Sequence, residues 1–250
     1  MKQLHWFLFF ALLFPPAVSG ETKSPLAVFQ EANGAYRGGD YSQAASLYES
    51  LAIQGAGNAS IYYNLANAYF KQDRLGRAIL YYEKAKRLAP RDRDISANLG
   101  HARGLLEYRI EDKRNWYAKT GEAILAYFTP LELGIASLGL GLLFWTSWAF
   151  SLYFRPASRW GWRRKALLVF TLGSLSLWFL KGIQTLTRQE AIVLKSQAAV
   201  RYGPSFKDQV ALRLGEGLKV GVRKQAGEWD RIVLTNGETG WIYQEEIGVI

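Results

Sequence analysis

The sequence predicts a multidomain membrane protein made of all-α helical repeats, two transmembrane helices and a small all-β barrel at the C-terminal end. Three observations predict this fold class. Residues 21–114 repeat a helical pattern, residues 133–154 and 166–180 contain no charged side chain, and residues 190–250 alternate apolar and polar residues between turns. These patterns are typical of packed helices, membrane-spanning helices and short strands, respectively.

The composition of the 250 residues excludes several classes of protein. Apolar residues make up 49%, aromatic residues 14% and charged residues 21%, which excludes a disordered chain. Because the chain has no Cys, disulfide scaffolds, zinc ribbons, iron–sulfur sites and thiol catalysis are excluded. Only two His residues are present, one of them in the N-terminal segment, so we expect no metal and no cofactor.

The net charge of +10 is concentrated in one short segment. Half of the excess lies in residues 155–165, which contain no acid and carry the cations Arg155, Arg159, Arg163, Arg164 and Lys165. A basic cluster between two apolar runs indicates membrane topology, because short loops rich in Lys and Arg stay in the cytoplasm. We therefore expect a membrane and no nucleic-acid partner.

Residues 1–20 predict a signal peptide. Lys2 precedes an apolar stretch over 4–14 that is too short to span a bilayer, followed by Pro15-Pro16 and four small residues. Cleavage is expected after Ser19 or Gly20. An uncleaved anchor is the alternative, and both interpretations export the segment that follows.

Residues 59–90 carry a pattern of aromatic and small side chains that predicts two antiparallel helices. The patterned positions are Tyr62, Leu65, Ala66, Tyr69, Ala78, Tyr82, Ala85 and Pro90. Residues 29–48 repeat the pattern with Tyr36 aligned to Tyr69, which leaves one residue fewer between the helices. A further helix from Asp92 closes the stack. Residues 21–114 therefore resemble two tetratricopeptide repeats with a capping helix; an ordinary helical bundle is the alternative.

The resemblance implies a concave groove, lined by the first helix of each repeat, that binds an extended peptide. Asn64 and Asn98 are the strongest candidates for contact with the peptide backbone, because an amide side chain both donates and accepts. The alternative is that these amides face water and bind nothing. The other candidates for the peptide-binding groove are Tyr63, Asn67, Phe70, Lys71, His101 and Arg37.

Two spans are predicted at residues 131–154 and 166–186, joined by the cytoplasmic basic loop. Residues 115–130 form a linker whose aromatic side chains favour a helix lying on the membrane surface, with an ordinary linker as the alternative. The loop places both soluble parts on the opposite side, in the periplasm, of a bacterial inner membrane.

Residues 187–250 read as a β domain with a hairpin turn at Asn236-Gly237. The runs at 200–205, 227–229 and 236–242 resemble those of a bacterial SH3-like domain, a family that binds peptides or cell-wall muropeptides or has a structural role. For its ligand surface we expect Tyr202 and Tyr243 to be exposed. Trp229 and Trp241 are expected to belong to the core rather than to contact a ligand.

No phosphate-binding loop, metalloprotease His pair or serine-hydrolase elbow is present in the sequence, and we expect no enzyme. The order of modules resembles the BatE group of Bacteroides aerotolerance proteins. That resemblance implies an inner-membrane adaptor in a cell-envelope complex, linked to stress or oxygen tolerance. The implied partners are von Willebrand factor A-type membrane proteins and a MoxR-type ATPase. The alternative function is a peptidoglycan-binding membrane protein that recruits cell-wall enzymes through its repeats.

Overall fold

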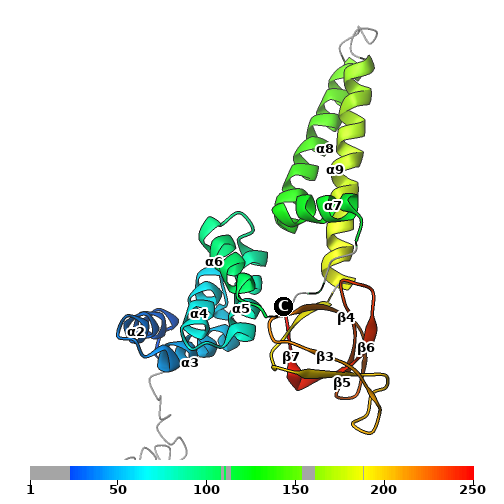
Figure 1. Ribbon diagram of the computed structural model, residues 1–250. Coiled ribbons are helices and arrows are strands. Elements are labelled where there is room, and N and C mark those ends of the chain that lie inside the picture. The colour runs from blue at the N-terminus through cyan, green and yellow to red at the C-terminus, as the bar shows by residue number, and fades with distance from the viewer. Residues whose placement is uncertain (1–22, 108–109, 111–113, 154–160, 188) are drawn as a thin grey trace, which may run out of the picture.

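The computed structural model describes residues 23–107, 110, 114–153, 161–187 and 189–250. The predicted signal peptide, Arg155 and Arg159 lie outside these residues. Figure 1 shows three parts: a stack of helices, a curved sheet beside it, and a long helical hairpin that leaves from between the two. The fold class predicted from the sequence is confirmed.

The helical stack is built on a spacing of 34 residues. Its helices are α2 (Pro25–Arg37), α3 (Tyr41–Leu51), α4 (Ala59–Lys71), α5 (Leu75–Leu88) and α6 (Arg93–Gly104). Because α2, α4 and α6 begin at residues 25, 59 and 93, each repeat is 34 residues after the last. The predicted alignment of the first repeat is therefore wrong by one residue. Tyr36 corresponds to Phe70, and no residue is missing between its helices.

Local sequence explains where these helices begin and how closely they pack. The side chains of Ser24, Asp40, Asn58 and Asp92 each accept a hydrogen bond from a backbone N–H in the first turn of α2, α3, α4 and α6. Ala32, Ala44, Ala66 and Ala78 are fully buried at repeat-equivalent positions. These small residues let the helices approach, and buried Tyr and Leu side chains fill the space between repeats.

The hairpin consists of α8 (Pro130–Tyr153) and α9 (Gly161–Thr187), preceded by the short helix α7 (Trp116–Tyr127). Segments Pro130–Phe150 and Gly161–Thr185 are long and apolar enough to cross a membrane by length and composition. The two helices pack together, with the Thr171 hydroxyl donating to the Leu140 carbonyl across the pair. Since α9 begins at Gly161, the cations at 163–165 lie in its first turns and not in the connecting loop as predicted.

The C-terminal part is one antiparallel sheet of seven strands. They are β1 (Gln189–Val193), β2 (Ala198–Arg201), β3 (Val210–Leu214), β4 (Lys219–Ala226), β5 (Trp229–Val233), β6 (Thr239–Tyr243) and β7 (Ile247–Val249). Their hydrogen-bonded order is β3-β2-β6-β5-β4-β1-β7. The predicted turn at Asn236-Gly237 joins β5 to β6, with Gly237 at φ 93°. The strand β7 was not expected from the sequence.

The helical stack and the sheet are packed against each other. Helix α5 contacts β1 and β7, and it is the repeat helix nearest the sheet in Figure 1. A Cβ atom on Gly76 of α5 would lie 2.8 Å from the carbonyl oxygen of Val193. A Cβ atom on Gly248 of β7 would lie 2.5 Å from Cδ2 of Leu80. These two glycines therefore allow a close approach that no other residue permits without a shift.

Candidate ligand-binding surfaces

The concave side of the repeats holds two neighbouring cavities, which we call the groove. The larger one, of about 320 Å³, is lined by Tyr36, Tyr63, Asn67, Phe70, Lys71, Tyr82, Asn98 and His101. The smaller one, of about 100 Å³, is lined by Asn33, Tyr36, Arg37, Tyr48, Asn64 and Asn67. The structure thus brings together every groove residue that the sequence predicted.

The amides of the groove are held by hydrogen bonds within the protein. Asn98 Nδ2 donates to Tyr63 Oη over 2.9 Å and to Asn67 Oδ1 over 3.1 Å, and the Tyr82 hydroxyl donates to that same oxygen of Asn67. Burial raises the pKa of Tyr82, so its hydroxyl stays protonated as a donor. The side chains of α4 and α6 are therefore fixed in one arrangement before any ligand arrives.

The first repeat contains the same arrangement around Asn33, a residue that sequence reasoning missed. Asn33 Oδ1 accepts a hydrogen bond from the Tyr48 hydroxyl over 2.6 Å and another from Asn64 Nδ2 over 3.4 Å. The pair Asn33–Tyr48 is the pair Asn67–Tyr82 shifted by one repeat of 34 residues. That spacing is the signal by which Asn33 could have been found.

These hydrogen bonds determine which polar atoms remain for a ligand. The carbonyl oxygens of Asn33 and Asn67 each accept two internal bonds, whereas their Nδ2 groups have no hydrogen-bond partner among the described residues. Asn64 and Asn98 show the reverse: their Nδ2 groups are occupied and their Oδ1 atoms have no partner there. Donors and acceptors therefore alternate along the groove, as they do along an extended peptide backbone.

The groove is also cationic. Arg37, Lys71 and His101 line its two cavities, and no acidic side chain does. The imidazole of His101 lies against the ring of Phe70, with centroids 5.6 Å apart. A ligand with a carboxylate is favoured over one with an ammonium group in such surroundings.

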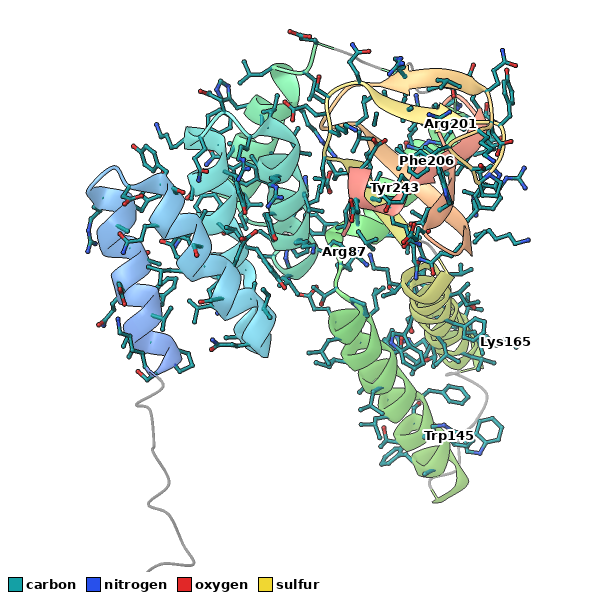
Figure 2. All side chains as sticks on the ribbon, turned by 90° about the horizontal axis from the view of Figure 1, so that it is seen from below. Arg87, Trp145, Lys165, Arg201, Phe206 and Tyr243 are labelled. Carbon is teal, nitrogen blue, oxygen red and sulfur yellow. The ribbon has the colours of Figure 1, made fainter. Side chains whose placement is uncertain are left out.

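A second surface lies on the outer face of the sheet. Phe206, from the loop between β2 and β3, lies 4.8 Å from Trp229 and 5.2 Å from Tyr243, and Trp229 lies 5.7 Å from Tyr243, all between ring centroids. Figure 2 shows Phe206 and Tyr243 close together on the sheet. Trp229 is only 7% exposed, but it is absent from the cluster that fills the barrel interior. Its burial comes from Phe206 and Tyr243 on the outside.

The remaining SH3-like candidates surround this aromatic cluster. Arg201 places its guanidinium carbon 5.9 Å from the ring centroid of Phe206, and it also pairs across strands with Trp241. Trp241 is half-buried and Tyr202 is exposed. The expectation that Trp229 and Trp241 belong to the core is wrong, since neither is part of the interior cluster. Phe206 was missed because no local pattern marks a loop residue that folds back on the sheet.

The topology residues lie at the far end of the hairpin from the sheet. Arg163 places its guanidinium 5.6 Å from the ring centroid of Trp162, and Lys165 is exposed. Figure 2 shows Lys165 on the hairpin, away from the labelled residues of the sheet. For Arg164 the structure describes the backbone alone.

Comparison with known proteins identifies the two soluble modules. The model of the tetratricopeptide repeat family matches residues 29–93, and the model of the bacterial SH3 domain family matches residues 195–248. No curated protein sequence matches the chain. The first match covers most of the helical stack and the second covers β2 to β7. The chain therefore combines two interaction modules, which supports a role in protein–protein interaction or in peptidoglycan binding.

Proposed function

We propose that this protein is a non-enzymatic membrane adaptor whose groove binds an extended segment of a partner protein. The alternation of donors and acceptors along Asn33, Asn64, Asn67 and Asn98 carries this proposal. Amide groups pair with the backbone of a peptide whatever its side chains, so the four amides give affinity. The surrounding cations then favour a peptide that is acidic or ends in a free carboxylate.

Peptide selection tests the groove. The full chain in lipid nanodiscs is used to enrich binders from a random peptide library, and the affinity of the best peptide is measured. We expect Asn67→Ala to weaken binding about tenfold, because one lost hydrogen bond costs about 1 kcal/mol or more. Gln43→Ala removes an amide from the exposed side of α3 and should change nothing. Equal affinities of wild type and Asn67→Ala contradict the proposal.

The membrane part of the proposal places α8 and α9 across a bacterial inner membrane and both soluble modules in the periplasm. The cations of 155–165 support this orientation. The chain has no Cys, so single cysteines can be labelled without background. In intact spheroplasts, an impermeant maleimide should label Gln54→Cys and Lys207→Cys. It should label Lys165→Cys only after permeabilisation, and the reverse pattern overturns the orientation.

A second candidate function is binding of peptidoglycan by the outer face of the sheet. The observation that favours it is the exposed aromatic cluster of Phe206 and Tyr243 beside Arg201. The test is cosedimentation of the detergent-solubilised full chain with purified peptidoglycan. Phe206→Ala should reduce the sedimented fraction, while Phe70→Ala, an aromatic truncation in the groove, should not. Absence of cosedimentation leaves the protein adaptor as the function.

We infer from the order of modules that the partners include von Willebrand factor A-type membrane proteins and a MoxR-type ATPase, in a complex for stress or oxygen tolerance. The resemblance to the BatE group supports this inference. A photo-crosslinker in place of Lys71, at the groove, should capture one of these proteins in cells that encode them. Capture of a cell-wall enzyme instead favours the peptidoglycan alternative.

A further inference from the structure

The largest charged cavity outside the groove lies where all parts of the chain meet. It has a volume of about 400 Å³ and is formed by the end of α5, by α7, by the start of α8, by the end of α9 and by β1 and β4. Figure 2 shows Arg87, one of its lining residues, at the junction between the repeats and the sheet. We call it the junction cavity.

The acidic side chains of the junction cavity are already paired. Glu83 pairs with Arg103 and, over 3.7 Å, with Lys219. Glu190 pairs with Lys219 over 2.7 Å, and Glu122 pairs with Arg114 over 2.6 Å. Three acids are therefore balanced by three cations, two of which, Arg103 and Arg114, approach from outside the lining of this cavity.

Further cations line the cavity without a carboxylate side chain of their own. Lys86 has no hydrogen bond or ion pair within the part of the chain that the structure describes. Lys181 Nζ donates to the carbonyl oxygen of Leu125 over 2.7 Å, and Arg87 Nη1 donates to an oxygen of Ile250 over 2.5 Å. The cavity therefore has an excess of positive charge that an anion would neutralise.

Helix α7 indicates where this cavity lies relative to a membrane. None of its residues is buried in the protein, and Trp116 is 76% exposed. Trp116, Ile124 and Tyr127 share one side of the helix by their spacing, and Lys119 and Glu122 lie on the other side. A helix of this kind lies in the headgroup layer with its apolar side toward the acyl chains. The junction cavity, which α7 helps to line, is then at headgroup depth.

We propose that the junction cavity binds the headgroup of an anionic phospholipid of the phosphatidylglycerol class. The ammonium groups of Lys86 and Lys181 pair with the phosphate oxygens, and the acyl chains follow the apolar surface of α8 and α9. Gln184 Oε1, in the same cavity, is buried without a hydrogen-bond partner among the described residues. A glycerol headgroup has hydroxyl donors for this acceptor, and it adds no cation to a site that already has an excess.

The inference rests on the proposed membrane placement and adds a role for the lipid. Because α5, α7, α9 and β4 all contribute to the cavity, one bound lipid contacts the repeats, the hairpin and the sheet together. The lipid would hold the groove at a fixed height above the bilayer. The adaptor would then act in membranes that contain the anionic lipid.

Native mass spectrometry of the full chain tests this site. The protein is released from nanodiscs with equal amounts of phosphatidylglycerol and phosphatidylethanolamine, and the retained lipid is identified. Wild type should retain phosphatidylglycerol. Lys86→Gln should reduce its affinity about fivefold and Lys86→Gln with Lys181→Gln about 30-fold, since each Lys near a lipid surface contributes about 1 kcal/mol. Lys207→Gln, a matched loss of charge on the far loop of the sheet, should bind like wild type.

The outcomes separate this inference from the membrane placement. A chain that enters nanodiscs but retains both lipids equally, or retains them equally in the Lys86→Gln variant, overturns the lipid site alone. A chain that fails to enter nanodiscs overturns the membrane placement and the lipid site together. Lys86 has no internal partner to lose, so loss of lipid in Lys86→Gln is not an effect of misfolding.

Discussion

The two helices of the second repeat have the same length class and opposite surroundings. Helix α4 turns Asn64 and Asn67 toward an open groove, whereas α5 packs Gly76 and Leu80 against the sheet. The groove side is polar and its hydrogen bonds are satisfied from within. The α5 side is apolar, contains small residues at the contact and is closed to solvent.

This difference separates two tasks within one repeat. Apolar burial at α5 contributes to the stability of the whole soluble part, because the repeats and the sheet share contacts there. Polar atoms in the groove contribute little net stability but define what can bind. Substitutions on α5 should therefore change the free energy of unfolding, and substitutions on α4 should change ligand affinity.

The largest expected effect comes from Leu80→Ala. Leu80 is buried and contacts Gly248 of β7, so its truncation should lower the free energy of unfolding by about 3 kcal/mol. Hydrogen exchange of the detergent-solubilised chain should also become faster in β1 and β7. Leu26→Ala in α2, where the side chain is exposed, is the control and should change stability by less than about 0.5 kcal/mol. Equal effects of the two variants would mean that α5 is not docked.

Alkaline pH should distinguish the repeats from the sheet. Burial raises the pKa of Tyr69 from 10 to about 12, with Glu49 as a further cause. Because the folded pKa exceeds the unfolded value, the stabilisation is complete below pH 10 and is lost as the pH rises to 12. Two pKa units correspond to at most about 3 kcal/mol. Hydrogen exchange at pH 9 and at higher pH should show the repeats opening before the sheet, with a smaller change in Tyr69→Phe.

The pH experiment has a clear contrary outcome. If Tyr69→Phe loses stability with pH as steeply as wild type does, general titration of Lys and Tyr side chains explains the loss, and the buried Tyr69 does not. Burial also raises the pKa of Tyr36 and Tyr48, so a partial change in slope is expected from one substitution.

The sequence predicted the groove well because a repeat transfers information from one unit to the next. Once residues 59–90 were recognised as a unit, their groove positions followed from helical spacing, and the structure places Asn64, Asn67 and Asn98 together. The error was local. Aligning Tyr36 with Tyr69 relied on residue identity, whereas the packing aligns Ala35 with Tyr69, since the 34-residue period of backbone positions is fixed.

The packing of α5 against the sheet could not be predicted from the sequence. Gly76 reads as an unfavourable residue in a helix, and its reason lies more than 100 residues further along the chain, at Val193. The same holds for Phe206, whose exposure in a loop gives no pattern. Contacts between modules depend on shapes that no local period encodes.

A smaller effect is expected from one substitution made at two glycines. Gly76→Ala should destabilise the chain by about 1 kcal/mol, because the new Cβ atom meets the carbonyl oxygen of Val193. Gly100→Ala, on α6, meets no atom within 4 Å and should stabilise the chain by about 0.5 to 1 kcal/mol through helix propensity. Thermal unfolding of both variants in detergent gives the two signs. Two stabilised variants would contradict the close contact at α5.

The smallest expected effect compares one lysine from each surface. Lys219 pairs with Glu190 and with the buried Glu83 at the α5 contact, so Lys219→Gln should lower the free energy of unfolding by about 1 kcal/mol, with Arg103 still pairing with Glu83. Lys71 lies exposed at the groove, and Lys71→Gln should leave stability within about 0.5 kcal/mol of wild type. Urea unfolding measures both changes. The selected peptide should show the opposite order, with affinity reduced by Lys71→Gln and unchanged by Lys219→Gln. A Lys71→Gln variant that loses stability but not affinity would show that the groove cation supports the fold, and the division of tasks between α4 and α5 would be wrong.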